Sequence, residues 1–129
     1  MGKKILVVDD EPDIIMYMTT LLEENGYDTD SAKDGVEGLT KAKENRPNLI
    51  CLDILMPEKS GIGLYRELRK DEELKEIPVI IVTGFKGDDN PLLTFKEFLY
   101  KRSVPGPEGY LEKPIDQKEF LETIKEKIK

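Results

Sequence analysis

Several residue types are scarce or missing in this chain of 129 residues, and each absence excludes a class of chemistry. There is no histidine, so no imidazole can serve as a base, a metal ligand or a phosphate carrier. The only cysteine, Cys51, cannot form an internal disulfide and lies in an apolar run, which is typical of a small buried hydrophobe. No apolar run is long enough to span a bilayer, and the patch after Lys3 and Lys4 stops at Asp9, too early for a signal peptide. We therefore expect a cytoplasmic protein.

Basic residues are also too few for a nucleic-acid-binding surface. Lys and Arg total 20 while Asp and Glu total 27, which gives a formal net charge of −7. Phosphate contacts need a concentrated basic surface, so we expect no direct binding to nucleic acid. The length fits one ordinary domain that buries its own core. Because no linker or repeat interrupts the pattern, residues 1–129 are predicted to form a single domain, with no output domain in this chain.

Short apolar runs alternate with segments of helical periodicity along the chain. That alternation is typical of βαβ units around a parallel sheet. The run at 79–82 is unbroken, which implies a strand buried on both faces, whereas the run at 27–31 is acidic and polar, as expected of an edge strand. We predict an α/β fold, a doubly wound five-stranded parallel sheet with helices on both faces. The strands are expected at 5–8, 27–31, 49–52, 79–82 and 109–112.

Local signals place the helices between these strands. For the second helix, Asp34 and Glu37 have the spacing of a capping box, and the helix is expected to end before Pro47. Its inward face is expected to consist of Val36, Leu39 and Ala42. The other helices are expected to begin at Pro12, after Gly61, at Pro91 and after Asp116, with a mobile loop at 84–89 and a non-helical connection at 103–107.

Polar residues follow the strands at the points where the strands end. Asp9 and Asp10 follow the first strand, Asp53 follows the third, Thr83 the fourth and Lys113 the fifth. In an open parallel sheet, ligands bind outside the carboxyl ends of the strands, where the strand order reverses. Three carboxylates, a hydroxyl and an ammonium delivered to that edge predict a metal-dependent site that handles phosphate.

The chemistry of this group favours an aspartyl phosphate. If the first and third strands are neighbours, Asp9, Asp10 and Asp53 converge, and they cannot all stay ionised without a cation or a raised pKa. Oxygen ligands favour Mg²⁺, with Mn²⁺ as the alternative ion. Asp53 is the best nucleophile, since a carboxylate can attack phosphorus and form a covalent intermediate. Lys113 would pair with the phosphoryl oxygens and Thr83 would donate a hydrogen bond to them.

Four stretches together resemble the receiver domain of response regulators in two-component signalling, of the CheY-like single-domain type. The resemblance spans essentially the whole chain and implies a flavodoxin-like strand order of 2-1-3-4-5. It further implies that Asp9 and Asp10 form a metal pocket, that Asp53 accepts the phosphoryl group, that the backbone carbonyl of Leu55 binds Mg²⁺, and that the Lys113-Pro114 bond is cis. The stretches are Val7-Val8-Asp9-Asp10-Glu11-Pro12, Leu52-Asp53-Ile54-Leu55-Met56-Pro57, Val82-Thr83-Gly84 and Glu112-Lys113-Pro114-Ile115.

The resemblance also implies partners and a switch. The donor would be a phosphohistidine on a sensor histidine kinase or a phosphotransfer protein, and small donors such as acetyl phosphate are expected to serve as well. Thr83 and Tyr110 would be the coupled switch residues. The signal would leave through the surface of the fourth helix, the fifth strand and the last helix, toward an output protein or a homodimer. On the fourth helix, apolar residues are more numerous than one inward stripe requires: Leu92, Leu93, Phe95, Phe98, Leu99 and Tyr100.

The sequence departs from the family pattern between Thr83 and Lys113. More residues separate them than a compact receiver has, and the stretch 104–107 reads as inserted, which puts the usual output surface in question. Leu55 is apolar, so it would not assist an attacking water, and we expect slow self-dephosphorylation. The chain would then catalyse only its own phosphorylation and dephosphorylation, and would not be an enzyme with an external substrate.

Three other functions agree less well with these residues. A phosphatase or phosphotransferase with Asp53 as nucleophile usually has a second acid two residues later, where Leu55 stands here. A flavin- or nucleotide-binding protein needs a loop rich in Gly, Ser or Thr after the first strand, but 9–13 is acidic. A receiver-like interaction module that is never phosphorylated would have no need for the complete set of site residues.

Overall fold

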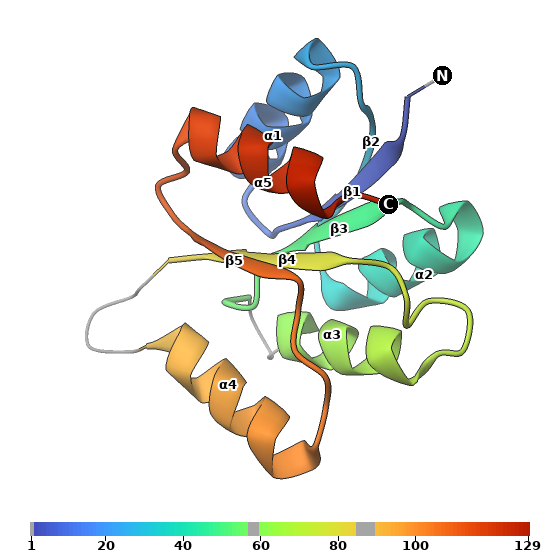
Figure 1. The fold of residues 1–129 in the computed structure, drawn as a ribbon, viewed down its shortest axis with the longest axis vertical. Helices are drawn as coiled ribbons and strands as arrows, with labels where there is room; N and C mark the ends of the chain where they lie inside the picture. Colours follow the sequence, from blue (N-terminus) through green and yellow to red (C-terminus); the bar gives the residue numbers. More distant parts are fainter. Residues whose placement is uncertain (1, 57–59, 85–89) are drawn as a thin grey trace.

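A computed structural model describes residues 2–56, 60–84 and 90–129 of the chain (Figure 1). Strands and helices alternate throughout, as the sequence predicts, and β2 starts and ends one residue later than expected. Pro57 and the predicted mobile loop, apart from Gly84, lie outside the described residues. The elements are β1 (Lys4–Val8), α1 (Pro12–Glu24), β2 (Asp28–Ala32), α2 (Gly35–Asn45), β3 (Leu49–Leu52), α3 (Ser60–Lys70), β4 (Val79–Thr83), α4 (Pro91–Arg102), β5 (Gly109–Glu112) and α5 (Gln117–Lys127).

The strands form one parallel sheet in the order β2-β1-β3-β4-β5. This order confirms the predicted doubly wound topology, and it places the polar strand β2 at an edge. Helices α1 and α5 cover one face, while α2, α3 and α4 lie on the other (Figure 1). Because β1 lies between β2 and β3, the chain changes direction across the sheet beside the carboxyl end of β1.

The sheet separates two apolar layers, because successive side chains of a strand point to opposite faces. Leu6 and Val8 pack toward α2, α3 and α4, whereas Ile5 and Val7 pack toward α1 and α5. The unbroken apolar run of β4 is buried at every position, as a strand covered on both faces requires. Among the residues that the structure describes, no helix is both long and apolar enough to cross a membrane.

Helix α2 starts with a side-chain cap but differs in two details from the expectation. The Asp34 carboxylate accepts a hydrogen bond from the Glu37 backbone N–H at 2.8 Å, as predicted. The Glu37 carboxylate, however, accepts from the N–H of Lys33 at 3.0 Å, one residue before the N-cap. The expected inward position of Val36 is wrong, since this side chain is 80% exposed. Gly38 and Ala42 line the inward face, where a Cβ on Gly38 would lie 2.8 Å from Leu64.

Helix α4 is held to the domain mainly through its buried Phe95. The ring of Phe95 packs edge-on against Tyr65 of α3, with centroids 5.1 Å apart, and at 6.4 Å from Tyr110 of β5. The helix begins at the predicted Pro91, and Asn90 caps it by accepting from the Leu93 N–H at 3.0 Å. Of the apolar residues noted on this helix, Phe95 and Leu99 are buried and Leu92 and Phe98 are partly buried, whereas Leu93 and Tyr100 are exposed.

The connection from α4 to β5 is fixed by specific polar contacts and is non-helical, as predicted. The hydroxyl of Tyr65 donates to the carbonyl of Pro105 at 2.6 Å. Glu108 pairs with both main-chain groups of Val79: its N–H donates to the Val79 carbonyl at 2.9 Å, and its side-chain Oε1 accepts from the Val79 N–H at 2.7 Å. Arg69 of α3 donates to the same Oε1 at 2.8 Å. These bonds tie the long connection to the start of β4.

Candidate functional site

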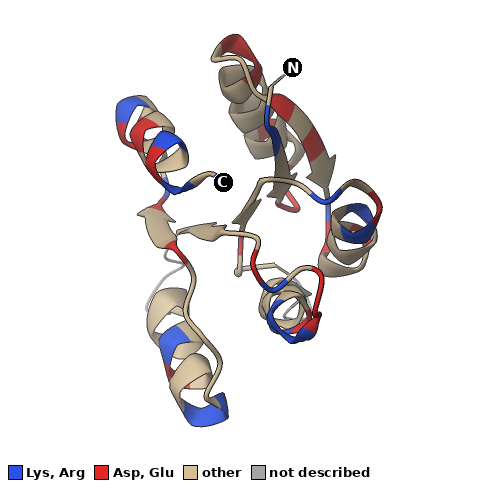
Figure 2. Ribbon diagram, turned by 45° about the vertical axis from the view of Figure 1, so that its right-hand side comes forward, with Lys and Arg blue, Asp and Glu red and all other residues tan. Residues whose placement is uncertain are grey.

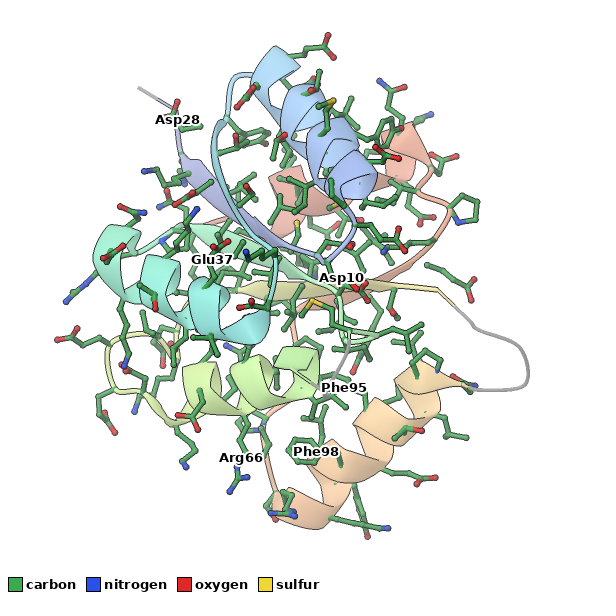
Figure 3. The ribbon with its side chains drawn as sticks, turned by 180° about the vertical axis from the view of Figure 1, so that it is seen from behind. Asp10, Asp28, Glu37, Arg66, Phe95 and Phe98 are labelled. Atoms are coloured by element: carbon green, nitrogen blue, oxygen red, sulfur yellow. The ribbon has the colours of Figure 1, made fainter. Side chains whose placement is uncertain are left out.

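The structure brings the predicted site residues together at the carboxyl edge of the sheet. Asp9 follows β1, Asp53 follows β3, Thr83 ends β4 and Lys113 follows β5, so four strands each deliver one side chain. The parallel register aligns these strand ends, since Val8 is paired with Leu52 and Thr83 with Glu112. Asp10 lies beside Asp9 in the loop that leads from β1 to α1 (Figure 3).

Asp53 is the centre of the hydrogen-bond network. Its Oδ1 accepts from the Thr83 hydroxyl at 2.9 Å and from the Leu55 backbone N–H at 2.8 Å. The Lys113 ammonium donates to Oδ2 of Asp53 at 3.2 Å and to Oδ2 of Asp9 at 2.8 Å. Asp9, Asp53 and Thr83 are 2%, 4% and 1% exposed, and in the part of the chain that the structure describes no other polar residue except Tyr65 is buried as a whole. Lys113 therefore forms ion pairs with two buried carboxylates.

The carboxylates of Asp9, Asp10 and Asp53 form a donor set for a hard cation. One oxygen from each can be chosen so that all lie within 4.8 Å of one another, and Asp10 is exposed while the other two are buried. Oxygen ligands with one side open to solvent suit Mg²⁺, which binds few carboxylates and keeps several waters. The two buried carboxylates also carry more negative charge than Lys113 balances. The residues present therefore fit the expected ion.

Burial and neighbouring charges shift the ionisation of the site. Burial raises the pKa of Asp53, and the negative charge of Asp9 adds to this effect, while the Leu55 N–H, Lys113 and Thr83 oppose it. Burial alone would disfavour the charged form of Lys113, but its contacts with Asp9 and Asp53 outweigh burial and raise the pKa of the ammonium. Lys113 is therefore positively charged at neutral pH.

The remaining predicted residues are Leu55, Pro114 and Tyr110. The Lys113-Pro114 peptide bond is cis, as the resemblance implies. The side chain of Leu55 is 38% exposed and its N–H contacts Asp53, whereas the role of its carbonyl as a metal ligand stays a prediction. Tyr110 is half-buried on β5 and is paired with Ile81, two residues before Thr83 on β4. Thr83 and Tyr110 thus lie on adjacent strands.

Two contributions to the site come from the backbone and were not foreseen. The Glu11 N–H donates to Oδ1 of Asp9 at 2.9 Å, which fixes this carboxylate as the Leu55 N–H fixes Asp53. Gly61, in the first turn of α3, approaches the acceptor loop so closely that a Cβ would lie 2.6 Å from the Cα of Ile54. A glycine shortly after the Asp53 stretch was the only sequence signal for this contact. The whole arrangement defines a class of protein, a doubly wound α/β domain with an acidic pocket at its carboxyl edge.

Comparisons with known proteins identify the family within this class. A family profile described as the response regulator receiver domain matches residues 5–125. The polar-differentiation response regulator DivK of Brucella anthropi is 39% identical over 127 residues, which cover 97% of this chain and 95% of DivK. The DivK protein of Brucella ovis gives the same identity and coverage. This chain belongs to the response regulator receiver domain family.

Solved structures agree with that assignment. The chemotaxis protein CheY4 of Vibrio cholerae has a TM-score of 0.82 and 26% identity, and the match covers 99% of this chain and 100% of CheY4. A CheY-like receiver domain protein from Methanospirillum hungatei has a TM-score of 0.81 and 31% identity, over 98% of this chain and 93% of that one. The receiver fold is therefore present along nearly the entire chain.

Proposed function

We propose that this chain is a phospho-accepting response regulator in which Asp53 receives the phosphoryl group from a phosphohistidine. The observation that carries the proposal is the position of Asp53 in a receiver domain. Its buried carboxylate accepts hydrogen bonds from Thr83 and Lys113 and lies beside Asp9 and Asp10. The donor is a sensor histidine kinase or a phosphotransfer protein, because this chain has no histidine of its own.

The transfer forms one bond and breaks one bond. A carboxylate oxygen of Asp53 attacks phosphorus, and the P–N bond to the donor histidine breaks. The electron pair of that bond stays on the ring nitrogen, and the donor leaves as neutral imidazole when its ring carries one proton. Acetyl phosphate reacts in the same way, with a P–O bond broken and acetate released. No acid–base residue of this chain is needed for either reaction.

Each neighbour of Asp53 has a part in this step. The Lys113 ammonium, already 3.2 Å from Oδ2 of Asp53, pairs with the negative phosphoryl oxygens. The Thr83 hydroxyl donates a hydrogen bond to the new group. Asp9, Asp10 and Asp53, with the backbone carbonyl of Leu55, would hold Mg²⁺. When bound, this ion neutralises charge on the transferred phosphoryl group.

The signal leaves the site through Thr83 and Tyr110. Once the Thr83 hydroxyl turns from Oδ1 of Asp53 to a phosphoryl oxygen, the space it vacates becomes available to the ring of Tyr110. In the present structure Lys96 of α4 lies over that ring, with Nζ 4.8 Å from the ring centroid, and the ring of Phe95 stands at 74° to it, with the centroids 6.4 Å apart. Inward rotation of Tyr110 would break the contact with Lys96. Phosphorylation therefore shifts a population between two packings of α4 against β5.

The surface formed by α4, β5 and α5 is the proposed output face. Leu93 and Tyr100 on α4 are 54% and 87% exposed, so this helix carries apolar groups that its own domain does not cover. An output protein or a second copy of the chain would cover them in the phosphorylated state. Slow loss of the phosphoryl group is expected there, since the side chain of Leu55 is apolar and cannot orient an attacking water.

Intact-mass spectrometry with acetyl phosphate and Mg²⁺ tests the phosphorylation. We expect one added phosphoryl group on the parent and none on Asp53→Asn or in the presence of EDTA. Asp10→Asn should raise the Mg²⁺ concentration that phosphorylation requires. Asp13→Asn should leave it unchanged, although Asp13 is an exposed carboxylate only three residues away. An adduct that persists in Asp53→Asn would place the acceptor elsewhere. No adduct and no Mg²⁺-dependent binding of beryllium fluoride would favour an unphosphorylated interaction module.

A further inference from the structure

A hollow of about 330 Å³ lies between the carboxyl-terminal ends of α3 and α4, on the connection that the sequence marked as inserted. Of the described residues that line it, four are basic and none is acidic, although the whole chain has a net charge of −7. Figure 2 shows the basic residues at the ends of these two helices, and Figure 3 shows Arg66 extending from α3 toward the end of α4. A local concentration of positive charge on an acidic protein needs a physical explanation.

One of the four cations is structural and three are available. Arg69 is only 5% exposed at its side chain, and its guanidinium is used by Tyr65, Glu108 and the carbonyls of Lys75 and Ile77. The other three cations are exposed, and within residues 2–56, 60–84 and 90–129 none of them forms an ion pair with a carboxylate. They are Arg66, Lys70 and Arg102.

Helix dipoles do not account for this arrangement. Basic residues in a last turn stabilise the negative end of a helix, and α2, α3, α4 and α5 all have them. Arg66, however, lies in the middle of α3. At the end of α4, the N–H groups of Ser103 and Val104 already bond the carbonyls of Tyr100 and Leu99, so Arg102 is not needed as a cap.

The lining of the hollow defines the chemistry of a ligand. Val104 and Pro105 provide an apolar surface, and Val104 packs against the core beneath it. Arg66, Lys70 and Arg102 surround that surface with positive charge, and a guanidinium can bind a phosphate through two parallel hydrogen bonds. The guanidinium of Arg102 also lies over the ring of Phe98, 5.8 Å from its centroid, which favours a defined orientation.

We propose that this hollow binds a small organic phosphate, with the phosphate between Arg66 and Arg102 and the apolar part of the ligand against Val104 and Pro105. The volume lies at the lower end of the range of small-molecule pockets, about 300–1,000 Å³. A concave site of this size favours a compact molecule such as a nucleotide over an acidic protein surface. The site lies at the opposite end of the strands from Asp53 and is independent of the phosphorylation chemistry.

Titration of the full chain with ADP and with inorganic pyrophosphate tests the proposal. The buffer contains EDTA, so that no metal can bridge the ligand to the carboxylates around Asp53. We expect changes in backbone amide shifts confined to residues 66–70 and 102–104, which line the hollow, and tighter binding of ADP than of pyrophosphate. Arg66→Gln and Arg102→Gln should each weaken ADP binding about tenfold, as expected for the loss of a charged hydrogen-bonded contact.

Lys101→Gln is the matched control, because Lys101 is an exposed cation in the last turn of α4 that does not line the hollow. Equal weakening by Lys101→Gln would show attraction by diffuse charge only and would overturn the proposal. Absence of shift changes with either probe at millimolar concentration would also overturn it. Binding of an oligoglutamate peptide instead of ADP, lost in Arg66→Gln and Arg102→Gln, would assign the hollow to an acidic protein partner and contradict a small-molecule site.

Discussion

The pairing of Glu108 with Val79 predicts that replacement of the partly exposed Glu108 lowers the stability of the protein substantially. Val79 is fully buried, and the Glu108 side chain is the acceptor for its N–H at 2.7 Å. Replacement of Glu108 by alanine leaves that N–H without this acceptor, at a cost of about 1–3 kcal/mol. Loss of the ion pair with Arg69 acts in the same direction, since the Arg69 side chain is only 5% exposed, although Arg69 keeps the Lys75 and Ile77 carbonyls as acceptors. We therefore expect Glu108→Ala to lower the free energy of unfolding by about 2 kcal/mol.

Urea unfolding followed by circular dichroism measures this effect, since the chain has no tryptophan for a fluorescence signal. With a slope of about 2 kcal/mol per molar urea, the midpoint should fall by about 1 M. Glu108→Gln keeps an oxygen for the Val79 N–H and should cost roughly half as much. Glu112→Ala, an exposed position at the other end of β5, is the control. If the unfolding free energies of Glu108→Ala and Glu112→Ala differ by less than about 0.5 kcal/mol, the bonds between Glu108 and Val79 do not stabilise the connection from α4 to β5.

Three further outcomes are expected. Asp34→Ala should cost about 1 kcal/mol in urea unfolding because the α2 cap is lost, whereas Asp34→Asn, which keeps an acceptor, should be close to the parent. Cys51 is buried and its thiol pKa is raised, so an aromatic disulfide reagent should label it only on unfolding; rapid labelling of the native protein would contradict its burial. In EDTA, the parent should gain stability relative to Asp53→Asn as the pH falls through the raised pKa of Asp53 toward 3.8, because protonation removes the buried negative charge from the parent only. A difference in unfolding free energy between the two proteins that is constant with pH would refute this reasoning.

The sequence predicted those parts of the site that follow from strand ends. Continuous apolar runs locate the strands, and parallel strands align their carboxyl ends, so Asp9, Asp53, Thr83 and Lys113 had to meet at one edge once the order was known. The strand order itself came from the resemblance to receiver domains, because periodicity alone does not specify which strands are neighbours. Because the structure has that order, it also has the predicted cluster of carboxylates.

Other features depend on distant parts of the chain and have no local signal. Glu108 contacts Val79 and Arg69, which are 29 and 39 residues away, and nothing in the sequence around 108 distinguishes it from a solvated glutamate. Val36 was predicted to face inward because valine is apolar. The close approach of α2 to the sheet and to α3 instead requires small residues such as Gly38 at the interface, which leaves Val36 outside.

Across the described residues, the buried carboxylates and the buried threonine all belong to the candidate site, whereas Tyr65 and the largely buried side chain of Arg69 make their polar contacts at the other end of the strands. The residues of the acidic site and the apolar residues that pack the core are therefore largely separate sets. The two apolar layers can exchange one aliphatic side chain for another over evolutionary time with little effect on the acidic edge. This separation gives a physical reason why a chain can be only 39% identical to DivK and still belong to the response regulator receiver domain family.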